Sequence, residues 1–176
     1  MLKKEIEPNL STSKQQTFEE LFLEYHPLLY RYGRKLSNNS YLTEECIQEL
    51  FIYIYEQEIV LSTIRHIKAY LFTSFRRRLL KKIQATKVPI SDVPSDIQFS
   101  PEDFLIQQEE FQQKERWVQA ALNSLPWRQR EVIYLRFFNN LSAKEIAEVL
   151  GIQRQVVSNV VYKAIKKLKN KSAKNK

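Results

Sequence analysis

The sequence predicts an all-α protein: two small helical domains joined by an acidic linker that contains prolines. Three observations favour this fold. Only two glycines, Gly33 and Gly151, occur among 176 residues, while hydrophobic residues make up 43% of the chain. The apolar residues recur at intervals of three and four, the period of amphipathic helices, and strand-like alternation is nearly absent. Prolines and aspartates then separate the helical segments into two groups.

The charge is unevenly distributed and divides the chain in the same way. Residues 1–86 carry 13 Lys and Arg against 10 Asp and Glu, residues 87–112 carry 1 against 6, and residues 113–176 carry 14 against 4. The formal net charge of +8 favours a polyanionic partner, with nucleic acid first and an anionic membrane surface second. The order basic, acidic, basic predicts two modules that face nucleic acid on either side of an acidic connector.

The residue types present argue against several classes of protein. Cys46 is the single cysteine and there are two histidines, so neither an internal disulfide nor a structural zinc site is expected. No stretch approaches the ~18 apolar residues of a membrane span, and the N-terminal segment lacks the apolar core of a signal peptide. We therefore expect a cytoplasmic protein with no membrane span, bound metal or cofactor. Cys46 itself is expected to be a small core residue.

The first module is predicted over residues 17–86, after a flexible arm at residues 1–16. Its first helix begins at Thr17, which has a glutamate three residues later as in a capping box. The apolar stripe is interrupted by Pro27 and then continues to Leu36.

Two further helices are expected in the first module. One runs from Thr43 to about Glu56, and the other begins at about Ile64. The third helix carries apolar residues at strict four-residue steps, which are Ile67, Leu71, Phe75, Leu79 and Ile83.

The third helix ends in the segment SFRRRLLKK, in which cations alternate with apolar residues. The spacing directs Phe75 towards the core and leaves Arg76, Arg77 and Lys81 facing outward. Arg78 lies only partly on the exposed face and is expected to pair with an acidic residue. A cation cluster gains from counterion release on DNA, and the nearby rings of Tyr70 and Phe72 are candidates for stacking on opened bases. A solvated basic face is the alternative interpretation.

Residues 87–107 are predicted to form the linker, because prolines occur there together with serine and aspartate. The second module is expected over residues 108–170 and a basic tail over residues 171–176. Trp117 and Trp127 are expected in its core. Four helices are predicted in this part of the chain, over residues 102–124, 126–138, 142–150 and 153–169. The first of them begins within the linker.

The strongest local pattern is LSAKEIAEVLGIQRQVVSNVVYKAIKKLK, from Leu141 to Lys169. Ser142 and Glu145 form a capping box, and Gly151 supplies the residue with positive φ that ends the helix. Two short helices, a glycine turn and a basic second helix predict a helix-turn-helix. The exposed face of its second helix carries residue types that bind phosphates and base edges, namely Arg154, Gln155, Ser158, Asn159, Tyr162, Lys163 and Lys166. A solvated polar face is again the alternative.

These segments resemble those of a known family. The stretch LNSLPWRQREVIYLRFFNNLSAKEIAEVLGI resembles the C-terminal promoter-binding region of bacterial RNA polymerase sigma factors. The segment EECIQELFIYIY resembles their polymerase-binding helix, and AYLFTSFRRRLLKK resembles the helix that melts and reads the minus-ten promoter element. Two such regions with only a short linker between them resemble the extracytoplasmic-function (ECF) group. One departure is Asn140, which replaces a turn glycine and is expected to adopt positive φ.

The resemblance implies a factor that binds core RNA polymerase and directs promoter-specific initiation under the control of an anti-sigma factor, without a small-molecule substrate. It implies that the second module binds the minus-thirty-five element through the exposed face of its last helix. The polymerase contacts that it implies are Glu45, Gln48, Glu49 and Phe51. The minus-ten contacts expected in the first module are Arg65, His66, Lys68, Tyr70, Arg76, Arg77 and Lys81.

Two other functions compete with this one. A stand-alone helix-turn-helix regulator would explain the second module but would leave the aromatic and basic first module without a role. An enzyme that acts on nucleic acid is disfavoured, because all three aspartates, Asp92, Asp96 and Asp103, lie in or beside the linker and no glycine-rich phosphate loop exists. We expect no catalytic residue.

Overall fold

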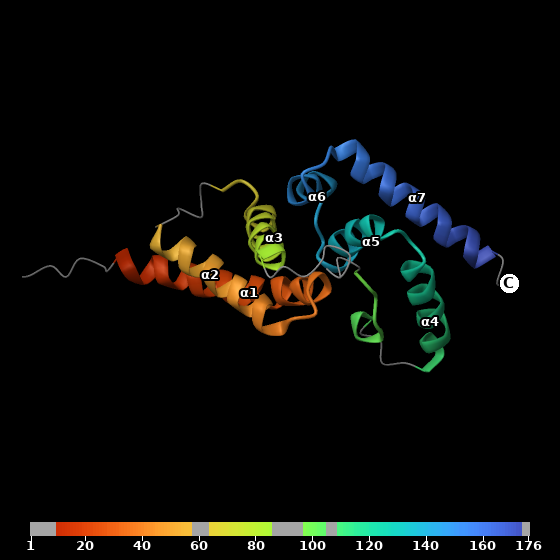
Figure 1. The fold of residues 1–176 in the computed structure, drawn as a ribbon, viewed down its shortest axis with the longest axis horizontal. Coiled ribbons are helices and arrows are strands. Elements are labelled where there is room, and N and C mark those ends of the chain that lie inside the picture. The colour runs from red at the N-terminus through yellow and green to blue at the C-terminus, as the bar shows by residue number, and fades with distance from the viewer. Residues whose placement is uncertain (1–9, 58–63, 86–96, 105–108, 174–176) are drawn as a thin grey trace, which may run out of the picture.

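The computed structural model of the protein describes residues 10–57, 64–85, 97–104 and 109–173, and all regular structure within these ranges is helical (Figure 1). The prediction of an all-α fold in two parts is confirmed. The first part lies before residue 86 and the second after residue 108, and an irregular segment at residues 97–104 lies between them.

The first module is a packed group of three helices, α1 (Leu10–Leu36), α2 (Ser40–Glu56) and α3 (Ile67–Ala85), each in contact with the other two. Its core contains Leu29, Leu50 and Phe75, none of which has exposed surface. The helices approach most closely at Gly33, where a Cβ atom would lie 2.5 Å from Thr43 Cγ2 and 2.6 Å from Phe75 Cζ. Glycine is therefore required in α1 at this point by space rather than by backbone angle.

The predicted boundaries of the first module need three corrections. Helix α1 begins at Leu10, so residues 10–16 are helical and not a flexible arm, while residues 1–9 lie outside the described part of the chain. Pro27 does not interrupt α1, because buried residues on both sides, Tyr25 and Leu29, hold the helix in the core despite the missing backbone donor. Helix α2 begins before Thr43, since the side chain of Asn39 accepts a hydrogen bond from the Leu42 amide at 3.0 Å and caps the helix.

The second module consists of α4 (Glu109–Asn123), α5 (Trp127–Ile133), the π-helical stretch η4 (Tyr134–Phe138), α6 (Ala143–Leu150) and α7 (Arg154–Ala173). Helix α7 contacts α4, α5 and α6. The predicted helix-turn-helix is confirmed in its details. Ser142 and Glu145 form the capping box, Gly151 ends α6 with φ of 65°, and Asn140 has the predicted positive φ, 53°.

Two expectations about the second module are wrong. The helix predicted to start at residue 102 is replaced by a single 3₁₀ turn, η3 (Pro101–Asp103), and α4 starts only at Glu109. Trp127 is 38% exposed, because it occupies the first position of α5, at the surface, and does not belong to the core. Of the predicted linker, residues 87–96 and 105–107 lie outside the described ranges.

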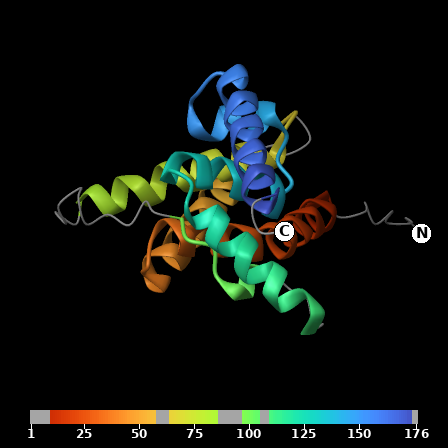
Figure 2. The ribbon, with the colours of Figure 1, turned by 90° about the vertical axis from the view of Figure 1, so that its right-hand side faces the viewer.

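The two modules pack against each other. Helix α6 lies on α3, as both ribbon views show (Figures 1 and 2). One cluster of buried apolar side chains continues from the first module into the second, and the Tyr32 and Tyr134 rings stack across the boundary at 6.3 Å. The arrangement places the second module over part of the surface that the sequence assigns to DNA.

Candidate nucleic-acid and partner interfaces

The exposed face of α7 collects the residues predicted to bind DNA in the second module. Val157 and Ala164 are completely buried on the other side of the helix. Tyr162, in contrast, is 67% exposed. All seven predicted residues, Arg154, Gln155, Ser158, Asn159, Tyr162, Lys163 and Lys166, are exposed. This face presents three cations, two amides, a hydroxyl and a phenol without acidic residues among them, a composition suited to phosphates and base edges.

The predicted DNA residues of α3 and of the turn before it fall into two groups. Arg65, Arg77 and Lys81 are exposed. His66, Lys68, Tyr70 and Arg76 are only partly exposed. His66 lies beside α6, with its Nε2 atom 3.4 Å from the Lys144 Nζ atom.

Charge at this boundary also affects Glu145 at the start of α6. Burial opposes ionisation of its carboxyl, but the hydrogen bonds from Ser142 and the positive charges of His66 and Lys68 outweigh burial and lower the pKa of Glu145. Glu145 of the second module is therefore attracted to His66 and Lys68 of the first.

Arg76 does not face outward as predicted. Its Nε atom donates to Glu131 Oε1 at 3.0 Å, and its Nη2 atom donates to Glu131 Oε2 at 3.4 Å. The hydroxyl of Tyr32 donates to the same Oε1 atom at 2.7 Å. The spacing within α3 gives no sign of Glu131, which lies 55 positions away on α5 and covers this face of α3 in the folded chain.

The pKa values within this group agree with its burial. Burial opposes the charge of Arg76, but the neighbouring Glu131 carboxylate outweighs burial and raises the pKa of the guanidinium. Burial, followed by the charge of Glu131, raises the pKa of Tyr32 well above its usual value, so the phenol remains a hydrogen-bond donor. Arg76 is thus a cation and Tyr32 a neutral donor, and both donate to the Oε1 atom of Glu131.

Two further expectations for α3 are wrong. Phe72 has no exposed surface and belongs to the core, so it is not available to stack on a base. The Arg78 guanidinium lies over the ring of Tyr53 on α2, 5.0 Å from its centroid, where an acidic partner was expected.

Helix α2 presents the residues predicted to contact polymerase, with one exception. Gln48 and Glu49 are exposed, and Lys82 of α3 bridges Glu49 at 2.6 Å and Glu45 at 3.0 Å. Phe51 is only 2% exposed and packs edge-on against Phe22, so it is a core residue and not a surface contact.

Sequence reasoning missed the exposed apolar side chains of α2. Ile52 is 54% exposed and Tyr55 is 65% exposed. Both lie on the same helix face as Gln48, at positions i+4 and i+7, and this spacing could have identified them. Exposed apolar side chains grouped beside polar residues are typical of a protein-binding surface.

The described residues give no indication of a reactive centre. Among them, no three His, Cys, Asp or Glu side chains are placed to hold a metal ion. Cys46 is buried, as predicted, and burial raises the pKa of its thiol to about 11, which leaves it unreactive near neutral pH. In the described part of the chain, no helix is long and apolar enough to cross a bilayer.

Comparisons with known proteins agree with this architecture. Residues 21–87 match the family profile described as Sigma-70 region 2, and residues 115–168 match that described as Sigma-70, region 4. The two profiles together account for the α1–α3 module, apart from the start of α1, and for most of the second module.

The chain is similar along most of its length to curated ECF RNA polymerase sigma factors. It is 26% identical to SigX of Bacillus subtilis over 88% of this chain and 83% of that protein. It is 23% identical to RpoE of Cereibacter sphaeroides over 88% of this chain and 86% of that protein. A shorter region is 38% identical to the sigma factor SigV of B. subtilis, over 36% of this chain and 39% of that protein.

A solved structure has the same fold. It is the sigma factor RpoE of Bartonella quintana, crystallised in complex with the anti-sigma factor NepR, with a TM-score of 0.59 and 20% identity. The match covers 90% of this chain and 98% of that one. Both sigma-70 regions are thus present in order, along a chain that matches ECF factors over most of its length. The chain belongs to the bacterial RNA polymerase sigma factors, in the extracytoplasmic-function group.

Proposed function

We propose that this protein binds core RNA polymerase and directs it to specific promoters, where it assists strand opening. The observation that carries the proposal is the presence of both sigma regions in one chain, the second with a helix-turn-helix whose α7 face is exposed. A stand-alone regulator needs only the second region. Recruitment of polymerase gives a role to the first region as well.

Helix α7 would enter the major groove of the minus-thirty-five element. Lys163 and Lys166 would neutralise phosphates and release counterions, which provides affinity without sequence preference. Asn159 is suited to a bidentate contact with adenine and Arg154 to one with guanine. The contact between Gln155 Nε2 and Asn159 Oδ1, at 3.1 Å, holds these two amides together on the face that would read the bases.

Helix α3 would hold the minus-ten region while its strands separate. The exposed Arg77 and Lys81 would grip the backbone, and Tyr70 provides a ring on which an unpaired base can stack. Strand separation requires binding energy and positioning only, with no bond of the DNA broken. The protein therefore acts without catalysis of its own, and the polymerase performs the chemistry.

Helix α2 would provide the polymerase contact through Gln48 and Glu49 together with Ile52 and Tyr55. These side chains combine polar groups with apolar area on one exposed face. A protein that covers this face or α3 would prevent holoenzyme formation. By analogy with the Bartonella relative, which was crystallised with an anti-sigma factor, we propose that an anti-sigma factor controls this chain as well.

The test is run-off transcription on genomic fragments with purified core polymerase, with and without the protein, followed by mapping of the start sites. We expect discrete transcripts only when both proteins are present, with two shared sequence elements upstream of the start sites. Failure of the protein to bind core polymerase would contradict the proposal. Tight sequence-specific binding to duplex DNA without polymerase would instead favour a stand-alone regulator.

A further inference from the structure

The structure holds the two modules in an arrangement that two-element promoter recognition does not permit. A minus-ten and a minus-thirty-five element are separated by about 25 base pairs, or roughly 85 Å of duplex. In this structure α6, which contacts α7, also packs directly on α3. Helices in contact lie at interaxial distances of about 8–10 Å, so the two DNA-binding surfaces are far too close together to reach both elements.

We propose that this is a closed, autoinhibited state, and that Glu131 holds it closed by occupying the Arg76 guanidinium in place of a DNA phosphate. The inference rests on the proposed function, because it concerns surfaces that would bind the promoter. The group formed by Tyr32, Arg76 and Glu131 is called the latch below. It joins α1, α3 and α5, and therefore both modules.

The geometry of the latch supports a competition between carboxylate and phosphate. The Arg76 guanidinium uses Nε and Nη2 to bind the two Glu131 oxygens, and this fork of donors binds phosphate oxygens equally well. The Glu131 side chain is 3% exposed and that of Arg76 is 19% exposed, and Nε and Nη2 of Arg76 are not available to a DNA phosphate while Glu131 binds them. Release of Glu131 and binding of a phosphate would exchange one anion for another on the same cation.

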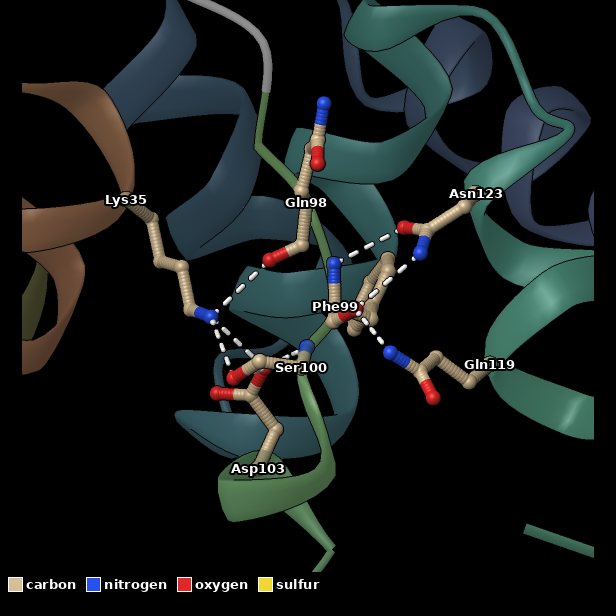
Figure 3. A network of polar contacts seen from close by, with 7 residues as sticks. All are labelled: Lys35, Gln98, Phe99, Ser100, Asp103, Gln119 and Asn123. Carbon is tan, nitrogen blue, oxygen red and sulfur yellow. Dashed lines mark hydrogen bonds and ion pairs between the residues drawn. The ribbon is translucent and has the colours of Figure 1, made fainter. Parts of the chain in front are cut away.

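A second set of contacts keeps the segment that connects the two modules folded against them. Residues 97–104, called the strap below, bind both modules, as Figure 3 shows. From α1, Lys35 Nζ donates to Asp103 Oδ2 at 2.6 Å and to the Gln98 carbonyl at 2.9 Å. From α4, Asn123 accepts from the Phe99 amide at 2.8 Å and donates to the Phe99 carbonyl at 3.0 Å.

The strap must be released for the chain to extend. Residues 86–108 lie between α3 and α4, and a fully extended segment of this length spans roughly 75 Å. That reach is close to the separation of the two promoter elements only if the strap also extends. In this structure the strap is folded onto both modules, with Ile97 completely buried and Phe99 1% exposed.

The buried ion pair between the two modules is suited to an interface that opens. A buried ion pair contributes little net stability, because desolvation of the two charges offsets most of their attraction, although it strongly disfavours any arrangement that leaves one charge unpaired. Since polymerase and promoter would bind only the open form, the closed population reduces their apparent affinity in proportion to the fraction of molecules that are open. Weakening the latch should therefore increase the apparent affinity.

The distance between the modules can be measured with spin labels on cysteines introduced at the exposed positions Asn38 and Lys169, because Cys46 is buried and remains unlabelled. The free wild-type protein should give a short, narrow distance distribution. Glu131→Arg should shift it to longer distances, and the double variant Arg76→Glu with Glu131→Arg should restore it. Glu148→Arg, the same charge change at an exposed position of α6, should leave it unchanged.

Glu131→Gln removes the charge with little change in the shape of the side chain. It replaces Glu131→Arg in the experiment if circular dichroism shows that the arginine variant does not fold. It should populate longer distances and reach half-maximal run-off transcription at a concentration roughly fivefold or more below that of the wild type. A free wild type that is already extended, or Glu131 variants that keep the short distance, would overturn the latch. If the wild-type protein also fails to support run-off transcription, the proposed function is contradicted. The distances between the spin labels would still decide whether Glu131 closes the chain.

Discussion

Arg77 and Arg76 are neighbours in sequence but occupy different surroundings. Arg76 is bound to Glu131, whereas Arg77 is exposed on α3 and available to bind DNA. We expect Arg77→Ala to slow open-complex formation several-fold while leaving the affinity for core polymerase within about twofold, since one phosphate contact is lost. Open-complex kinetics and core binding, measured on the same preparation, test this expectation. An equal loss of both would indicate a folding defect.

Gly33 determines how closely the first module can pack. Alanine would gain about 1 kcal/mol in helix propensity, but its Cβ would collide with Thr43 and Phe75. Overpacking of a core costs about 1–3 kcal/mol, and two contacts below 3.0 Å place this substitution near the upper end, so Gly33→Ala should lower the free energy of unfolding by about 2 kcal/mol net. Urea denaturation measures the change, and an unchanged or higher stability would show that the helices can move apart at no cost.

Cys46 should behave as a protected thiol. Burial raises its pKa to about 11, so the folded protein retains a proton that the unfolded chain loses near pH 9. Stability should therefore fall as pH rises from about 9 to 11 and should not depend on Cys46 at neutral pH. At pH 8 a thiol reagent should modify Cys46 slowly in the native protein and rapidly in denaturant. Equally fast modification in both would contradict burial of the thiol.

At the scale of the elements, the short helix α6 depends on its cap. The Ser142 hydroxyl accepts from the Glu145 amide at 3.2 Å, and the Glu145 carboxylate accepts from the Ser142 amide at 2.7 Å. Loss of such a cap costs about 1 kcal/mol. Ser142→Ala should therefore lower the melting temperature by a few degrees, whereas Ser158→Ala on the exposed face of α7 should leave it nearly unchanged. Equal melting temperatures for the two variants would show that the cap does not stabilise α6.

The elements were predictable where the signal is local. The capping box, the positive φ of Gly151 and Asn140 and the apolar stripe of α7 depend on residues within one or two turns of each other. The start of α2 was misplaced because two polar residues, Asn39 and Thr43, compete for the cap and only the backbone geometry decides between them. The passage of α1 through Pro27 depends on tertiary packing, which overrides local propensity.

At the scale of the whole molecule, the sequence indicated two modules and their separate surfaces but not their arrangement. Arg76 and Glu131 are 55 positions apart, and Tyr32 and Glu131 are 99 positions apart. Neither pair belongs to a periodic pattern that would connect them. The sequence therefore assigned Arg76 to the DNA surface, and only the packed structure shows the carboxylate that covers it.

We predict that this chain enables core polymerase to open a promoter. Permanganate footprinting tests this directly, because the reagent modifies thymines that are unpaired and unstacked. On a promoter identified by run-off transcription, we predict reactive thymines near the minus-ten element only when core polymerase and this protein are both present. Thymines that stay unreactive with both proteins, or that react equally without this one, would contradict a role of this chain in promoter opening.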